Sequence, residues 1–235
     1  MKRHWKKLVG GLVLLAILGS TAGVWVYIHW IKADAPARLT INDITTGTGA
    51  SPGTTGTGAP SGTPSNSWTV TSSSQVGYRV VEVLFGQDTE GVGRTSKVTG
   101  SLTLDAAIVS TATFTVDMTS LKSDDARRDR KFTGQIMNTA TIPTALFTLS
   151  KPIDLVTAPT DSTQVTASAT GDLLLHGVTK PVTFNLTAKR TGNTIAVSGA
   201  FDVKFADYAI NNPSGGPVTT QDHGLIEFAL AFAKT

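Results

Sequence analysis

Residues 165–187 read VTASATGDLLLHGVTKPVTFNLT, and this stretch decides the fold class of the chain. Apolar residues alternate with hydroxyl-bearing and charged residues on both sides of His176-Gly177. A period of two puts every second side chain on the same face of a β-strand, so the stretch predicts two strands separated by a turn. Gly177 suits that turn because glycine tolerates backbone conformations closed to other residues. We extend the predicted turn through residues 178–181, since Pro181 has a fixed φ.

The same alternation recurs along the chain from Trp68 onward. Each segment is apolar on one face and mostly hydroxyl-bearing or charged on the other, as expected for strands with one buried face. The segments are residues 76–80, 102–104, 112–118, 147–149, 165–175, 182–186, 195–203 and 226–232. About eight antiparallel strands are therefore predicted, and the chain is assigned to the all-β class. Alternation by itself fits two closures, a sandwich of two sheets or one sheet closed into a barrel.

Residues 123–132, SDDARRDRKF, break the alternation and are compatible with a helix. Ser123 is a favourable N-cap, and Asp124 and Arg128 are spaced for an i,i+4 ion pair. We expect one short helix across a mouth of the barrel, with its charged side chains in solvent. A second interpretation of the same segment is a basic rim, in which Arg127 and Arg128 contact a lipid headgroup.

The charge distribution argues against a nucleic-acid-binding protein. The 235-residue chain has a formal net charge of +3, but Lys2, Arg3, Lys6, Lys7 and Lys32 all precede residue 33, with no acidic residue among them. The rest of the chain has 15 basic and 17 acidic residues and is slightly acidic. A protein that tracks a phosphate backbone needs a basic stripe, and this sequence has none. We therefore expect no nucleic acid partner.

No catalytic or metal-binding pattern stands out in the sequence. The chain has no Cys, which excludes disulfides, zinc–thiolate sites and thiol nucleophiles. His176 and His223 lack the H-x-H or H-x-x-x-H spacing of metal ligands, and no nucleophile is marked beside the Asp222-His223 pair. A G-x-S-x-G match at residues 49–53 falls in a Gly/Thr/Ser/Pro-rich stretch that cannot supply the strained turn of a hydrolase. We expect no catalytic residues, no metal and no cofactor, and we predict that the protein is not an enzyme.

Residues 8–31 form an apolar run of 24 residues without Asp, Glu, Lys or Arg. A helix of this length spans roughly 36 Å, against roughly 30 Å of bilayer hydrocarbon. The basic residues in the segment 1–7 predict a cytoplasmic N-terminus and an extracytoplasmic position for everything after the run. The alternative is a signal peptide cleaved near Ala22. Because the apolar run continues through Ile31, where cleavage would expose it to water, we expect an uncleaved single-pass anchor in the cell membrane.

Gly, Thr, Ser and Pro dominate residues 44–67 without any periodicity. Such a composition cannot bury enough apolar surface to fold. We therefore predict a disordered linker over residues 32–66, which holds the following domain off the bilayer. The globular domain is predicted to occupy residues 67–235.

That domain carries a series of short motifs in a fixed order. They are Trp68-Thr69-Val70, Gly100-Ser101-Leu102, residues 117–124 (DMTSLKSD) followed by Arg128-Asp129, residues 142–147 (IPTALF), residues 171–182 (GDLLLHGVTKPV), and Asp207-Tyr208-Ala209-Ile210 with Pro213. In order and spacing they resemble the YceI-like family of lipid- and polyisoprenoid-binding proteins over residues 67–234. The family's usual Thr in the longest motif is Leu174 here, and residues 85–97 lack the usual histidine-containing stretch. These departures leave the identity of the ligand open.

The resemblance implies a lipocalin-like antiparallel β-barrel with an internal apolar channel. We expect this channel to bind a long-chain lipid of isoprenoid or fatty-acyl type, for sequestration or transport outside the membrane. The pocket candidates are apolar or aromatic residues of the alternating segments: Tyr78, Leu102, Phe114, Val116, Phe147, Leu173, Phe184, Leu186, Ile226, Phe228, Leu230 and Phe232. The alternative is a non-catalytic cell-surface interaction domain whose barrel is filled by side chains. The volume of the cavity distinguishes the two hypotheses. The sequence gives no indication of the oligomeric state.

Overall fold

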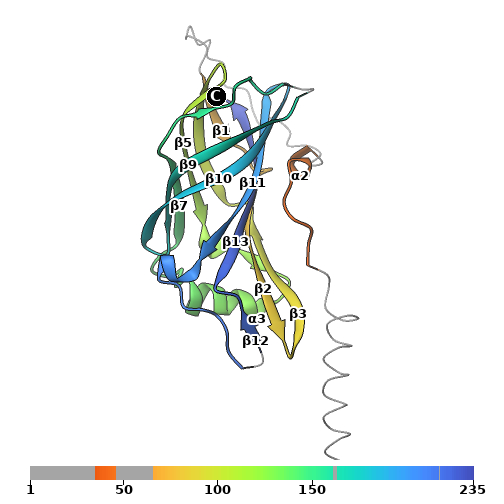
Figure 1. Ribbon diagram of the computed structural model, residues 1–235, viewed down its shortest axis with the longest axis vertical. Coiled ribbons are helices and arrows are strands. Elements are labelled where there is room, and N and C mark those ends of the chain that lie inside the picture. The colour runs from red at the N-terminus through yellow and green to blue at the C-terminus, as the bar shows by residue number, and fades with distance from the viewer. Residues whose placement is uncertain (1–34, 46–65, 161–162, 217) are drawn as a thin grey trace, which may run out of the picture.

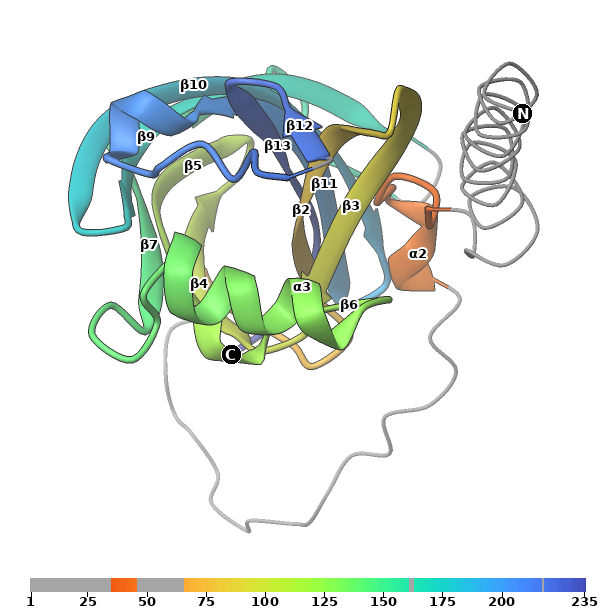
Figure 2. The same ribbon diagram turned by 90° about the horizontal axis from the view of Figure 1, so that it is seen from below.

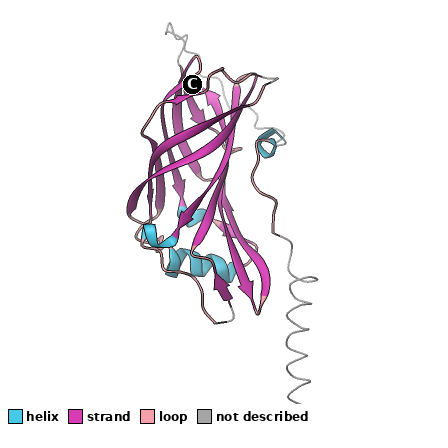
Figure 3. Cartoon of the chain, viewed as in Figure 1, coloured by secondary structure: helices cyan, strands magenta, loops and turns pink. Residues whose placement is uncertain are grey.

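The computed structural model describes residues 35–45, 66–160, 163–216 and 218–235, which are mostly β-structure (Figures 1 and 3). The strands are β1 (Ser67–Val70), β2 (Gln75–Leu84), β3 (Gln87–Thr95), β4 (Val98–Asp105), β5 (Ile108–Asp117), β6 (Lys122–Ser123), β7 (Thr144–Leu149), β8 (Ile153–Asp154), β9 (Val165–Leu175), β10 (Val178–Thr191), β11 (Thr194–Lys204), β12 (Val218–Thr220) and β13 (His223–Lys234). The helical segments are α2 (Asn42–Thr45), η2 (Met118–Ser120), α3 (Ala126–Lys131), η3 (Phe132–Ile136) and η4 (Phe205–Tyr208).

Eight strands form a closed antiparallel barrel. In the order β1-β4-β5-β7-β9-β10-β11-β13, the last strand pairs back with the first, so that Trp68 lies opposite Lys234. The predicted all-β class and the antiparallel barrel are confirmed, and the sandwich is wrong. β2 follows β1 along the same edge of β13, and the β2–β3 hairpin continues that wall to the α3 end of the barrel (Figure 1).

The stretch quoted first forms β9 and β10, which pair from Val165↔Ala188 to Leu175↔Val178. The turn between them consists of His176 and Gly177 alone, with φ values of 50° and 78°. The longer predicted turn through residues 178–181 is wrong, because those residues already belong to β10. Pro181 is tolerated inside this strand because β11 pairs with β10 only from Leu186 onward, so no second neighbour needs its missing N–H.

A short helix lies across one mouth of the barrel, as predicted (Figure 2). Its start differs from the prediction. Asp125, not Ser123, is the N-cap, and its side chain accepts a hydrogen bond from the backbone N–H of Arg127 at 2.7 Å. Ser123 instead lies in β6, where its backbone N–H donates to Asp129 Oδ1 at 2.8 Å. The expected pair of Asp124 and Arg128 is present.

Residues 35–45 pack against the outer face of the barrel, and we call this segment the strap (Figure 2). Its apolar residues are buried at 7% exposure each and cluster with three alanines of the wall: Leu39, Ile41 and Ile44 against Ala196, Ala229 and Ala231. The prediction of a disordered linker over residues 32–66 is therefore wrong for the strap. The composition after residue 45 is Gly- and Thr-rich, but the strap has apolar side chains, and the small alanines let it approach the sheet closely.

The strap also covers a buried charged cluster on the outer face. Glu227 is fully buried and accepts a hydrogen bond from Arg94 Nη2 at 2.7 Å, while Arg79 Nη2 lies 3.5 Å from its other carboxylate oxygen. Arg79 donates to the backbone oxygen of Pro36 at 2.6 Å, and Arg94 donates to that of Ala37. Backbone carbonyls of the strap thus supply one acceptor to each of the two arginines, although Nε of Arg79 and Oε2 of Glu227 remain buried without a hydrogen bond.

The predicted membrane anchor, residues 8–31, lies outside the described residues. Within the ranges that the structure describes, no helix is long and apolar enough to cross a membrane.

Candidate functional site: an apolar cavity inside the barrel

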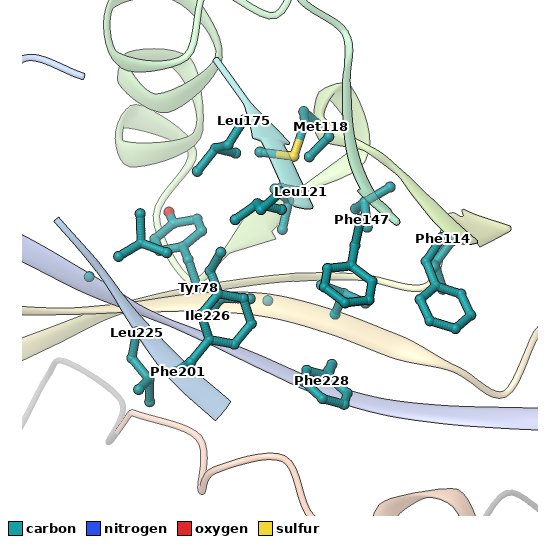
Figure 4. Close-up of a pocket in the computed structure, with 18 of the residues that line it drawn as sticks. Tyr78, Phe114, Met118, Leu121, Phe147, Leu175, Phe201, Leu225, Ile226 and Phe228 are labelled. Atoms are coloured by element: carbon teal, nitrogen blue, oxygen red, sulfur yellow. The ribbon is translucent and has the colours of Figure 1, made fainter. Parts of the chain in front are cut away.

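The barrel encloses a cavity of about 1320 Å³. This exceeds the roughly 300–1,000 Å³ of a typical small-molecule pocket. All twelve predicted pocket residues lie on its wall: Tyr78, Leu102, Phe114, Val116, Phe147, Leu173, Phe184, Leu186, Ile226, Phe228, Leu230 and Phe232. Figure 4 shows several of them around the same space. Arg127 and Arg128 also line the cavity.

Aromatic side chains leave the lumen open because they lie against glycines in the wall. Each of four rings occupies the place where a glycine of a neighbouring strand would carry a Cβ: Tyr78 at Gly93, Phe114 at Gly100, Phe147 at Gly171 and Phe228 at Gly199. A Cβ built on Gly199, for example, would lie 2.6 Å from Cζ of Phe228. The rings therefore pack along the sheet instead of filling the lumen. A barrel packed solid with side chains, the alternative hypothesis, does not fit this arrangement.

Contacts between aromatic rings connect the middle of the cavity. Phe184 stacks on Phe201 with ring centroids 4.7 Å apart, and it meets Phe147 at 5.5 Å and Phe228 at 5.6 Å. Phe114 continues the series, 6.3 Å from Phe147. These rings come from five different strands, so the apolar lining is continuous around the wall.

The two ends of the cavity differ in polarity. Its charged lining residues all lie at the α3 end: Glu82, Asp124, Asp125, Arg127, Arg128 and Lys131. At the opposite end the lining is apolar and closed, with Val109 at 8%, Ile153 at 6% and Leu155 at 6% exposure. An amphiphile would therefore enter with its apolar chain towards Leu155 and leave its polar group beside α3.

Ion pairs already neutralise the predicted headgroup residues. Arg128 is bonded to Asp124 and lies 3.7 Å from Glu82. Burial opposes its charge, but these two carboxylates outweigh burial and hold the pKa of Arg128 above its usual value. Hydrogen bonds from the Arg127 side chain and backbone lower the pKa of Asp125 to about 2. A headgroup must therefore share these cations with protein carboxylates.

Burial raises the pKa of Tyr78 well above its usual value. Its ring stacks on Phe132 at the base of α3, with centroids 4.8 Å apart. Tyr78 thus lines the cavity beside the end of α3.

Several wall residues were missed as pocket candidates. Met118, Leu175 and Phe201 belong to alternating segments that the sequence displays, so periodicity could have found them. Leu121 and Phe132 lie in the connection between β5 and β7, where no period exists to assign a face. Figure 4 shows Met118, Leu121, Leu175 and Phe201 beside the predicted residues.

Neither histidine of the domain meets a catalytic partner in the described residues. His176 Nδ1 lies 3.0 Å from the backbone oxygen of Tyr208, and His223 Nδ1 lies 2.7 Å from Asp222 on the surface. The described ranges also hold no group of three or more His, Asp or Glu side chains placed for a metal ion.

Comparison with known proteins places this barrel in a family. The sequence model of the YceI-like domain matches residues 68–232. The chain belongs to the YceI-like domain family. Two UPF0312 proteins of Pseudomonas putida, from strains W619 and GB-1, are 36% and 35% identical to it over 96 residues. These alignments cover 40% of this chain and 46% of each relative, so the chain spans about half the length of the curated relatives it matches.

Two solved structures share the fold of this YceI-like chain. Burkholderia cenocepacia BcnA superposes with a TM-score of 0.54 at 24% identity, over 69% of this chain and 98% of that one. A polyisoprenoid binding domain from Saccharophagus degradans, implicated in plant cell wall breakdown, gives 0.57 at 18% identity, over 73% and 99%. At these identities the likeness concerns the fold alone.

Proposed function

We propose that this YceI-like chain binds one long apolar lipid inside its barrel and performs no catalysis. The observation that carries the proposal is the cavity of about 1320 Å³, closed and apolar at one end and charged at the other. An apolar lining of this extent is unfavourable for water and favourable for hydrocarbon.

The chain length of the ligand follows from energetics. Each buried methylene contributes about 0.8 kcal/mol, so a dozen contribute about 10 kcal/mol. Association costs roughly 4–15 kcal/mol in lost freedom. A ligand with an apolar chain of a dozen carbons or more is therefore favoured, without any specific polar contact.

The proposed ligand class is isoprenoid or fatty-acyl. The isoprenoid choice is supported by the polyisoprenoid binding domain of Saccharophagus degradans, which has the same fold. We further propose that residues 8–31 anchor the chain in the cell membrane and that the barrel lies on the extracytoplasmic side. The lipid would then be sequestered or carried at that surface.

Direct extraction tests the proposal. Organic solvent extraction of the purified chain, followed by mass spectrometry, is expected to release one class of long-chain lipid in about equimolar amount. The lipid-stripped, refolded protein is expected to take up a fluorescent prenyl or fatty-acyl probe.

A variant with a charged side chain in the lumen tests whether the lipid binds there. Phe228→Glu is expected to abolish probe uptake, whereas Ser168→Glu, on the exposed face of β9, keeps it. Circular dichroism of both variants checks folding. An empty extract together with a wild type that takes up neither probe would refute lipid binding.

A further inference from the structure

The strap changes what the Gly/Thr-rich stretch can do. Residues 46–65 connect the strap to Asn66 and β1, and both flanks are fixed to the same barrel: Ile44 is buried against it, and Asn66 bonds to Asp105. A segment that begins and ends on one body cannot act as a spacer between that body and the membrane. The two fixed flanks argue against a spacer role for residues 46–65, which themselves lie outside the described residues.

The segment between the apolar run and the strap is short. Only residues 32–34 separate the apolar run 8–31 from Ala35, the first residue of the strap. A fully extended chain reaches at most about 3.3–3.6 Å per residue, so Ile31 lies within roughly 15 Å of Ala35. If the run spans the bilayer, the barrel is held against the membrane surface.

The direction in which the strap runs determines which end of the barrel faces the membrane surface. Pro36 and Ala37 lie beside Arg79 and Arg94, and the strap then runs towards Ala231, near the C-terminal end of β13. Traced backwards from α2 to Ala35, the strap runs towards the α3 end, while the C-terminus lies at the opposite end (Figure 1). The charged mouth of the cavity lies at this same α3 end.

An exposed aromatic residue marks the same end. Phe85 occupies the tip of the β2–β3 hairpin, is 60% exposed and has a φ of 49°. Bulky side chains are rare at positive φ, and a two-residue hairpin turn whose second residue is glycine, here Gly86, prefers Asn or Asp at the first. Val156 shows the same combination of exposure and positive φ, but of the two only Phe85 lines the cavity, and it does so at the charged end, which points to a functional use of its ring there.

We propose that the α3 end of the barrel docks on the bilayer, with Phe85 in the interfacial layer, so that lipid passes between membrane and cavity without crossing water. This inference rests on the proposed lipid binding and membrane anchoring. Basic and acidic side chains are mixed around the mouth, so contact is driven by the apolar ring and the short tether, and zwitterionic lipid suffices.

Site-specific fluorescence tests the docking. Because the chain has no Cys, single variants Phe85→Cys and Val156→Cys can each carry one environment-sensitive fluorophore. Val156 is the matched control, because it is also an apolar loop residue, 88% exposed with a φ of 61°, beside the closed end. In full-length protein reconstituted into phosphatidylcholine vesicles, nitroxide lipids are expected to quench the label at 85, and aqueous iodide the label at 156. Equal iodide quenching at both positions, or the reverse pattern, overturns the proposal.

A lipid-transfer assay tests whether docking affects function. Phe85→Asn removes the ring and creates a more favourable turn, so this variant is expected to unfold at a higher temperature and yet take up prenyl probe from vesicles at least fivefold more slowly. Val156→Ser is expected to stay within twofold of wild type. An unchanged rate in Phe85→Asn overturns the docking role of Phe85. If wild type takes up no probe even from detergent, lipid binding itself fails, whereas the quenching pattern still decides the orientation.

Discussion

A single substitution in the lumen measures whether the barrel is hollow in solution. Val116 lies near the C-terminal end of β5, lines the cavity and is only partly buried, at the junction of the two apolar clusters of the barrel. Val116→Phe adds about four carbon atoms at this point. In a cavity of about 1320 Å³ the larger ring has room without moving its neighbours.

A hollow interior and a close-packed interior predict opposite changes in the free energy of unfolding. Burying four carbons at about 0.8 kcal/mol each stabilises by at most about 3 kcal/mol, and by roughly half of that if the ring stays half-exposed to the cavity. In a close-packed interior the same insertion destabilises by about 1–3 kcal/mol. We expect Val116→Phe to raise the free energy of unfolding of lipid-free protein by 1–2 kcal/mol, by this bookkeeping.

Urea denaturation of stripped, refolded protein is the assay. With a typical slope of about 2 kcal/mol per molar urea, the midpoint is expected to rise by about 0.5–1 M. Uptake of a long-chain probe should fall at the same time, because the ring takes space from the ligand. Thr113→Phe is the control, since Thr113 lies on the exposed face of the same strand. A midpoint below that of wild type, or a higher midpoint with undiminished uptake, would refute the hollow barrel.

Four further predictions concern other parts of the chain. Glu227→Ala removes the buried carboxylate that pairs with Arg94 and Arg79, leaving Arg79 only its pair with Glu90, and is expected to destabilise by about 3 kcal/mol, measured by urea midpoint, whereas Asp88→Ala at an exposed position of β3 should change little. Gly177→Val is expected to lose about 1–3 kcal/mol, because φ at this position is 78°, and an unchanged midpoint would contradict the strain. The folded-state pKa of Tyr78 is raised by burial, so its contribution to stability is complete below pH 10 and is lost as the pH rises further; the fall between pH 9 and 11 should be shallower in Tyr78→Phe. Protease cleavage within residues 46–65 is expected to leave the N-terminal fragment bound to the barrel through the strap, and separation of the two pieces on a sizing column under native conditions would argue against strap docking.

Local periodicity identified the strands and their inward faces. The run from Val165 to Leu175 needs only a period of two to reveal which side chains share a face, and closing the sheet sends that face inward. This is why all twelve pocket candidates lie on the cavity wall, although their binding of lipid stays a prediction. Periodicity could not locate Leu121 or Phe132, which lie in an irregular connection where no repeating pattern assigns a face.

Other features depend on contacts between residues distant in sequence. Pairing of β13 with β1 decided barrel against sandwich, because closure depends on strands at opposite ends of the domain. The strap could not be foreseen, since Leu39 and Ile41 look like isolated apolar residues until Ala229 and Ala231 offer a shallow surface for them. The hollow lumen likewise needs Phe228 placed over Gly199, a pair 29 positions apart. The sequence alone determined strand identity and side-chain facing, because these follow from local backbone geometry; only the tertiary structure decided closure, cavity and strap, because these arise from the packing of distant segments.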